Sequence, residues 1–205
     1  YERAFRLLDL STAMVLLTRD DLADRQRYLN ARATLQTLIE LKVIPVINEN
    51  DSVATDEIKL GDNDTLAAMV ASALSADVLV LLTDQNGLHE RDPREDPDAA
   101  VIENADATDP KLDLYASGGG TLGRGGMITK VAAARLAARS GTTTVIANGN
   151  DPDVLTRIAQ GETTGTVLET KLEPLVARKR WLASQLQVKG QISLDDGAVR
   201  AIREK

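Results

Sequence analysis

Residues 65–84 read TLAAMVASALSADVLVLLTD, and this stretch indicates the fold more clearly than any other. Its first part, 65–76, has apolar residues at helical spacing, whereas 77–83 is a short apolar run rich in Val and Leu. A helix that leads at once into a fully apolar strand is typical of α/β domains, because helices cover the strands of a parallel sheet. The stretch therefore predicts an α/β fold.

The same alternation recurs along the chain. Apolar runs predict further strands at 12–18, 43–47, 142–147 and 165–169. Periodic segments predict helices at 20–42, 126–141 and 151–161. We therefore expect an open, mostly parallel sheet sandwiched by helices.

Helix ends and one long connection can also be predicted. Asp20 is expected to cap the first of these helices. Asp151 is expected to cap the last, with Pro152 in its first position and Gly161 at its end. The segment 86–123 lacks a long periodic element, and irregular excursions of this length in compact domains are usually functional or mobile.

Composition excludes several classes of site. The net charge of −7 argues against a general nucleic-acid or membrane surface, which would need an excess of Lys and Arg. The absence of cysteine excludes disulfides, thiol nucleophiles and Cys-ligated zinc, and it fits a reducing cytoplasm. The single histidine, His89, cannot form a His-rich metal site, and we predict no metal-ligating residues. No apolar run approaches the ~20 residues of a membrane span.

Polar turns follow three of the predicted strands: NENDS at 48–52, DQNG at 84–87 and NGND at 148–151. Ligands of open α/β sheets bind beyond the carboxyl ends of the strands, so we expect these turns to converge on one edge. Asn, Asp and Gly are also favourable turn residues, so each turn taken alone has a purely structural explanation.

The glycine-rich run SGGGTLGRGGMITK, residues 117–130, is the sharper signal. Successive backbone N–H groups form a cradle for an anion, and the following helix N-terminus and Lys130 add positive charge. This pattern suits a phosphate chain, although it is neither a Walker A motif nor a dinucleotide fingerprint. The alternative is a flexible surface loop with an incidental lysine.

A second cluster, GDND at 61–64, crowds the start of an apolar helix. One acid there is needed as an N-cap, and two acids exceed that need. Asp64 could orient a lysine by charge pairing, and Asn63 could bind a carboxylate or an amine of a ligand. A metal site is a weak alternative.

Five segments, taken together, resemble the glutamate 5-kinases of the amino acid kinase superfamily. They are VIPVINENDSV, KLGDNDTLAA, VLVLLTDQNGL, DPR and GGMITKVAAARLAARSG, and they occur in this order at fitting spacing. The resemblance runs from Leu16 to Trp181. It implies phosphorylation of the γ-carboxylate of L-glutamate by ATP with Mg²⁺, the first step of proline biosynthesis. It also implies a cytoplasmic homodimer or homotetramer, with proline as a feedback inhibitor.

The same resemblance implies roles for single residues. Lys130 would act on the transferring phosphoryl group, and Asp64 would organise the catalytic lysines. Glutamate would be bound by Asp51, Asn63, Asn48 and Asn50. The nucleotide would be bound by Thr83, Asp84, Arg124, Gly125, Gly126, Met127, Ile128, Thr129 and Lys130. The family usually has Thr where this chain has Arg124.

Two expectations concern the extent of the protein. The family carries a lysine and a Gly/Ser phosphate loop on a strand ahead of Tyr1, so we expect a longer native chain and an inactive fragment. Residues 1–181 would form the kinase domain, and 182–205 a linker and the beginning of a PUA-like β domain. The acidic chain gives RNA binding no independent support.

Two alternative functions stay open. The first is another amino acid kinase, or the kinase part of a bifunctional pyrroline-5-carboxylate synthase, against which the PUA-like segment argues. The second is a non-catalytic module that senses an amino acid.

Overall fold

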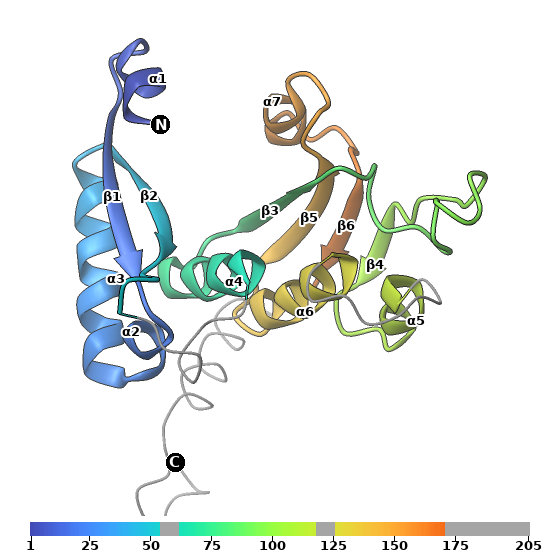
Figure 1. Ribbon diagram of the computed structural model, residues 1–205, viewed down its shortest axis with the longest axis horizontal. Coiled ribbons are helices and arrows are strands. Elements are labelled where there is room, and N and C mark those ends of the chain that lie inside the picture. Colours follow the sequence, from blue (N-terminus) through green and yellow to red (C-terminus); the bar gives the residue numbers. More distant parts are fainter. Residues whose placement is uncertain (54–61, 118–125, 171–205) are drawn as a thin grey trace, which may run out of the picture.

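The computed structural model describes residues 1–53, 62–117 and 126–170. Its strands form two sheets (Figure 1). The first sheet pairs β1 (Ser11–Leu17) with β2 (Val43–Glu49) in parallel, in a register that runs from Ser11–Val43 to Leu17–Glu49. The second sheet has the order β3-β5-β6-β4. It consists of β3 (Val78–Thr83), β5 (Thr143–Asn148), β6 (Thr166–Glu169) and β4 (Asn104–Asp106).

Among the described residues, three of the four pairings between strands are parallel, and the pairing of β5 with β6 is antiparallel. The predicted α/β class with a mostly parallel sheet is therefore confirmed. The described strands are nevertheless divided between two sheets rather than joined in one. The limits of the five predicted strands lie within two residues of the observed limits, and β4 was not predicted.

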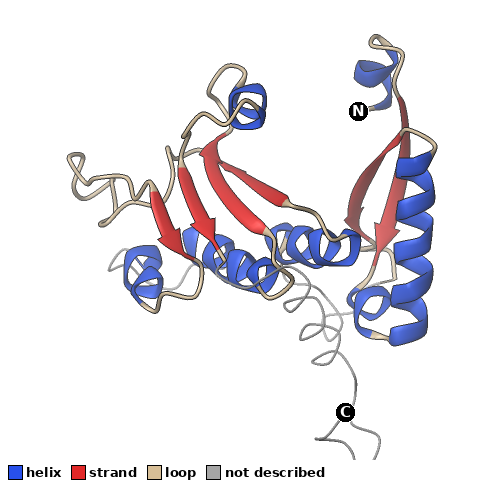
Figure 2. Ribbon diagram, turned by 180° about the vertical axis from the view of Figure 1, so that it is seen from behind, coloured by secondary structure: helices blue, strands red, loops and turns tan. Residues whose placement is uncertain are grey.

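Helices flank both sheets (Figures 1 and 2). The long α3 (Arg25–Glu40) packs against the first sheet beside the short α2 (Arg19–Ala23). Along one side of the second sheet lie α4 (Asn63–Leu74), α6 (Met127–Ala138) and α5 (Lys111–Ser117). Two further short helices are α1 (Glu2–Arg6) and α7 (Val154–Ala159). No helix in the described part of the chain is long and apolar enough to cross a membrane.

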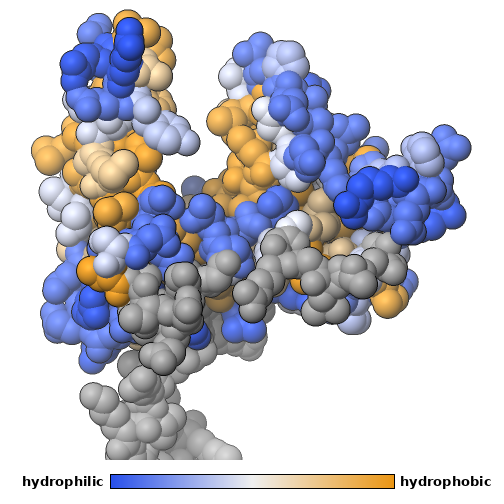
Figure 3. Space-filling model, viewed as in Figure 1, coloured by the Kyte–Doolittle hydropathy of each residue, from blue (hydrophilic) through white to orange (hydrophobic). Residues whose placement is uncertain are grey.

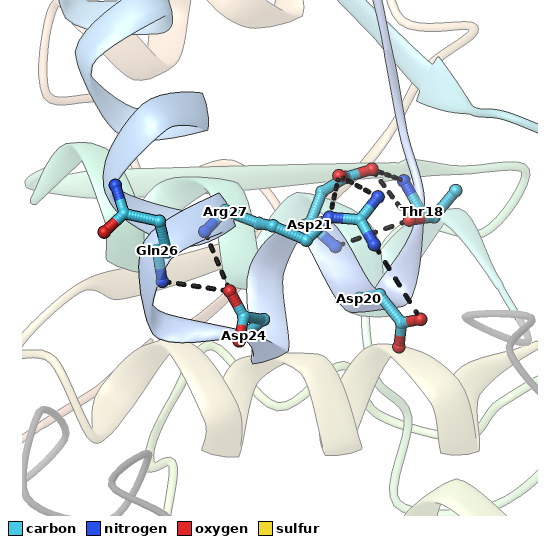
Figure 4. Close-up of polar contacts among 6 residues, drawn as sticks. All are labelled: Thr18, Asp20, Asp21, Asp24, Gln26 and Arg27. Atoms are coloured by element: carbon cyan, nitrogen blue, oxygen red, sulfur yellow. Dashed lines mark hydrogen bonds and ion pairs between the residues drawn. The ribbon is translucent and has the colours of Figure 1, made fainter.

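The helix predicted over 20–42 is broken at Asp24, and the predicted cap at Asp20 is wrong (Figure 4). Thr18 caps α2 instead. The Asp21 backbone N–H donates to Thr18 Oγ1 at 3.3 Å, and the Thr18 N–H donates to Asp21 Oδ2 at 2.7 Å. Asp24 then caps α3 by accepting from the N–H groups of Gln26 and Arg27, each at 3.0 Å. A Thr followed three residues later by an acid makes this reciprocal box, which fixes the start of α2.

The predicted cap of the last helix is also wrong. The helix begins at Val154, and its N-cap is Asp153, not Asp151. Asp153 has a left-handed backbone with φ of 57° and makes no capping side-chain bond. Pro152 therefore lies in the turn before the helix rather than in its first position.

The excursion 86–123 is held to the sheet at its base. The Leu88 N–H donates to the buried Thr166 Oγ1 at 2.8 Å, and the Ile102 N–H donates to the Leu88 carbonyl at 2.8 Å. His89 forms an isolated bridge with Val101. Further along, the excursion contains β4 and α5, so it has more regular structure than the sequence indicated.

One helix, α4, joins the two sheets. Leu66 and Ala73 pack in the cluster that includes Leu17 and Leu22 next to the first sheet. Ala68 and Ala71 pack on the other side, in the cluster built on β3 and α6. Between β2 and β3 the same helix lines a groove of about 470 Å³, whose walls include Ile47 and Leu79. Figure 3 shows this opening, with hydrophobic surface on both of its sides.

Candidate functional site

The carboxyl ends of β3 and β5 lie at one edge of the second sheet, and those of β6 and β4 lie at the opposite edge, because β5 and β6 run antiparallel. α4 leads directly into β3, and α6 leads directly into β5. Each helix contacts the strand that follows it, and Thr83 and Asn148 end the two strands at their shared carboxyl edge. In open α/β sheets this is the side on which ligands bind.

An ion pair joins the N-termini of α4 and α6. Lys130 Nζ lies 3.2 Å from Asp64 Oδ1 and 3.1 Å from Asp64 Oδ2. The two side chains are only 13% and 20% exposed, so much of the surrounding water is excluded and the attraction is stronger than at an open surface. The charge pairing predicted for Asp64 is thus confirmed. The neighbouring Asp62 is the N-cap, since its Oδ1 accepts from the Thr65 N–H at 2.7 Å.

A third side chain contacts the pair. Thr129 Oγ1 lies 2.7 Å from Asp64 Oδ2 and 2.8 Å from the Gly126 carbonyl oxygen. No feature of the sequence predicted the Asp64 contact, because it depends on how the two helices are rotated against each other. A lysine and a threonine from α6 therefore converge on one carboxylate from α4.

The start of α6 has no side-chain cap among the described residues. Its N-cap is Gly126, which makes no side-chain capping bond, and its first turn carries no acid. The first N–H groups of a helix have no partner within it, and those of Met127, Ile128 and Thr129 accordingly have no intrahelical acceptor. Gly126 has φ of +94°, a conformation that other residues rarely adopt.

Two of the three predicted polar turns meet at the carboxyl edge of β3 and β5. The Gly149 N–H donates to the Thr83 carbonyl at 2.8 Å, and Asn148 Nδ2 donates to Asn86 Oδ1 at 2.9 Å. Thr83 Oγ1 in turn donates to Asp84 Oδ1 at 3.1 Å. The turns themselves were predictable, whereas the amide pair depends on the strand register.

The third turn follows β2 and belongs to the other sheet, so the expectation that all three turns would share one sheet edge is wrong. In this turn the Asn50 N–H donates to the Leu17 carbonyl at 2.9 Å, and Asn50 Oδ1 accepts from Ser52 Oγ at 2.6 Å. Asn48 and Asp51 are exposed. Asn63, also exposed, begins α4 and lines the groove between the sheets.

The DPR motif lies near the tip of the excursion 86–123. Arg94 Nη2 donates to Asp92 Oδ2 at 2.6 Å, and the Arg94 backbone N–H donates to Asp92 Oδ1 at 2.9 Å. These hydrogen bonds lower the pKa of Asp92 to about 2. Asp92 is therefore ionised at any physiological pH.

Comparison with known proteins identifies the family. The sequence model of the Amino acid kinase family matches residues 1–148. The chain belongs to the amino acid kinase family. Over the whole of this chain it is 61% identical to a glutamate 5-kinase from Chromohalobacter salexigens and 57% identical to one from Teredinibacter turnerae. It covers 54% and 55% of those two proteins, so it spans about half the length of the curated relatives that it matches.

Solved structures support the amino acid kinase fold. A UMP kinase from Ureaplasma parvum aligns with a TM-score of 0.56 at 15% identity, over 82% of this chain and 64% of that one. An isopentenyl phosphate kinase aligns with a TM-score of 0.55 at 18% identity, over 81% and 62% of the two chains. At such low identity these likenesses bear on the fold alone.

Several predicted features of this amino acid kinase chain lie outside the described residues. They are Arg124, Gly125 and the second unit predicted at 182–205. Among the residues that the structure describes, no group of three or more His, Asp or Glu side chains could hold a metal ion.

Proposed function

We propose that this chain is part of an enzyme that transfers the γ-phosphoryl group of ATP to the γ-carboxylate of L-glutamate. The observation that carries the proposal is the Lys130–Asp64 pair beside the uncapped start of α6. The curated relatives named glutamate 5-kinase, at 61% and 57% identity, support this choice of substrate.

The nucleotide would lie along the start of α6 and the carboxyl edge of β3. Backbone N–H groups from Gly126 to Thr129 would contact its phosphates, and Thr83 and Asp84 would line its pocket. Arg124 and Gly125 would complete the covering loop. The N-terminal end of a helix dipole favours negative charge, and no acid of the first turn opposes it. ATP with Mg²⁺ would supply the phosphoryl group and part of the charge neutralisation.

Glutamate would bind through Asp51 and Asn63, together with Asn48 and Asn50 of the turn that holds Asp51. Asp51 offers a negative charge to the α-amine, and Asn63 can donate to a carboxylate or accept from an amine. The attacking γ-carboxylate is already ionised at neutral pH, so the reaction needs no general base. Neither a cysteine nor a histidine cluster is required.

Two anions must approach each other in this reaction, and Lys130 would offset their repulsion. Phosphoryl transfer depends mainly on positioning and charge stabilisation. Asp64 would keep the Lys130 ammonium in place before the phosphates arrive. Lys130 would then turn part of its hydrogen bonding toward the transferring group, where charge develops.

Assembly and regulation belong to the same proposal. The protein would work in the cytoplasm as a homodimer or homotetramer, with proline as a feedback inhibitor. Residues 1–181 would be the kinase part, and 182–205 would begin a PUA-like domain without a role in RNA binding. The 205 residues alone would be inactive, because the relatives are almost twice as long.

The test is a coupled assay of ADP release by the full-length protein. We expect turnover with L-glutamate and less than about one hundredth of that rate with aspartate, N-acetylglutamate or UMP. Preference for one of these other substrates would indicate another amino acid kinase. Binding of glutamate without any ADP release would contradict the proposal and favour the sensing module.

A further inference from the structure

The Thr129 hydroxyl faces Asp64 rather than open solvent. Its oxygen lies 2.7 Å from Asp64 Oδ2 and 2.8 Å from the Gly126 carbonyl oxygen. A threonine hydroxyl has one proton, so it donates to only one of these two acceptors at a time. Hydrogen bonds to ionised acceptors are about twice as strong as neutral ones, and the Asp64 carboxylate is therefore the preferred partner.

The contact gives Asp64 a second side-chain donor besides Lys130. Among the described residues, Asp64 Oδ2 accepts from both Thr129 Oγ1 and Lys130 Nζ, whereas Oδ1 accepts from Lys130 Nζ. Asp64 is a residue of α4, whereas Thr129 and Lys130 are neighbouring residues of α6. The hydroxyl thus fixes the carboxylate from the same helix that carries the lysine.

We propose that the Thr129 side chain is a positioning group that orients Asp64 and, through it, Lys130, while only the backbone N–H of Thr129 serves the nucleotide. The inference rests on the proposed phosphoryl transfer. When Lys130 turns toward the phosphates, Asp64 loses part of its hydrogen bonding to the ammonium. The Thr129 hydroxyl, which carries no charge to be drawn to the phosphates, stays on Asp64 and keeps the carboxylate in place for the lysine.

The role predicts a specific kinetic signature in the full-length protein. Thr129→Val keeps the shape of the side chain but removes the hydroxyl. We expect kcat to fall about tenfold, a typical effect of losing a hydrogen bond to a charged group, while the KM for ATP changes by less than about twofold. Thr129→Ser restores the hydroxyl, so its kcat should lie within about twofold of that of the parent enzyme.

The opposite signature would overturn the inference. If the hydroxyl contacted the nucleotide, Thr129→Val would raise the KM for ATP about tenfold and leave kcat nearly unchanged. Thr108→Val is the matched control, because Thr108 Oγ1 also donates to an aspartate, Asp106 Oδ1, at 2.6 Å, in the turn before α5. Both kinetic constants of that variant should stay within about twofold of the parent values.

A second measurement does not depend on turnover. Trace acetylation followed by mass spectrometry reports how firmly the Lys130 amine is held. We expect Thr129→Val to raise labelling of Lys130 about threefold and Thr129→Ser to leave it unchanged. Equal labelling of all three proteins would overturn the positioning role. If the parent enzyme released no ADP with glutamate but the labelling changed as expected, the proposed function would fail and the positioning of Lys130 would stand.

Discussion

At the scale of single residues, the sequence already contains one more acid at the start of α4 than a helix cap requires. Two acids flank Asn63, and a helix start needs only one as its cap. The surplus acid, Asp64, therefore needs another partner, and Lys130 at the start of the next long helix supplies it at 3.1 Å. The Thr129 contact could not be predicted in this way, because helix rotation is decided by packing and not by local sequence.

Gly165 shows what a close approach of two strands requires of one residue. Its φ is +81°, and a Cβ at this position would lie 2.1 Å from the Ile146 carbonyl oxygen of β5. Gly161 has nearly the same φ, +83°, but a Cβ there would meet no atom within 4 Å. A side chain at Gly161 would therefore meet backbone strain alone, whereas one at Gly165 would meet both strain and a steric clash.

We expect Gly165→Ala to lower the free energy of unfolding by at least about 3 kcal/mol, because it adds a clash to the strain of a left-handed backbone. Gly161→Ala should cost only about 1 kcal/mol, the strain alone. Urea denaturation of both variants of the full-length protein measures the difference. Equal losses would show that β5 and β6 shift apart at little cost.

At the scale of elements, the break between α2 and α3 explains why one predicted helix is two. The apolar spacing over 20–42 continues across the break, so periodicity alone cannot locate it. Capping decides it instead, since Thr18 with Asp21 starts one helix and Asp24 starts the next (Figure 4). Asp21 also lies 2.7 Å from the Arg27 guanidinium, which joins the two helices.

The pKa of Asp21 makes the stability of the junction between α2 and α3 depend on pH. Burial raises the pKa, but hydrogen bonds from Thr18 and the charge of Arg27 outweigh it, so the pKa lies below the ordinary value of 3.8. A lowered folded-state pKa stabilises the fold above the unfolded-state pKa, and this stabilisation is lost as the pH falls through the folded-state value. The relevant window is therefore below about pH 4.

We expect Asp21→Asn to lower the free energy of unfolding by about 1 kcal/mol at pH 7, as for the loss of a helix cap. The difference from the parent protein should shrink as the pH falls below 4, because protonation then removes the same charge from the parent. Asp20→Asn is the control, since Asp20 makes only a 4.0 Å contact with Arg27 and should cost less than about 0.5 kcal/mol. A difference for Asp21→Asn that stayed constant down to pH 2 would contradict this account.

The whole molecule departs most from the sequence prediction in its two sheets. Five of the six described strands were predictable from apolar runs, whereas β4 and the antiparallel direction of β6 were not. Strand neighbours were not predictable either, because any two such strands can pair. The edges of β2 and β3 that face the groove have no strand partner among the described residues. The groove itself is mostly apolar, lined by side chains such as Ile47, Leu66, Val70 and Leu79. It therefore suits packed side chains better than a charged substrate.

The apolar groove gives a prediction about the 205-residue chain on its own. Exposed apolar surface of this kind is a site for association, and unpaired strand edges add to it. We expect the isolated chain to bind the dye ANS and to elute as more than a monomer in size-exclusion chromatography. The full-length protein should bind at least about fivefold less dye per molecule. Equal and weak dye binding by both proteins would show that the groove needs no further cover.

Those parts of the site that helix starts and turns determine could be predicted from the sequence. Contacts that depend on how strands and helices pack could not. Helix starts and polar turns can be predicted from Gly, Asp and Asn. That Asp64 could pair with a lysine was predicted in this way, and the structure shows that the lysine is Lys130. The amide pair of Asn86 and Asn148 depends on the register of β3 against β5. No local pattern specifies that register.

The most direct test of the central claim is kcat for glutamate-dependent ADP release by the full-length protein with Lys130→Ala. If Lys130 stabilises the transferring phosphoryl group, kcat should fall roughly 10²–10³-fold, the usual effect of removing one transition-state donor. Circular dichroism would establish that the variant is folded. A folded variant with kcat within about threefold of the parent value would contradict the assignment of this ion pair as the centre of phosphoryl transfer.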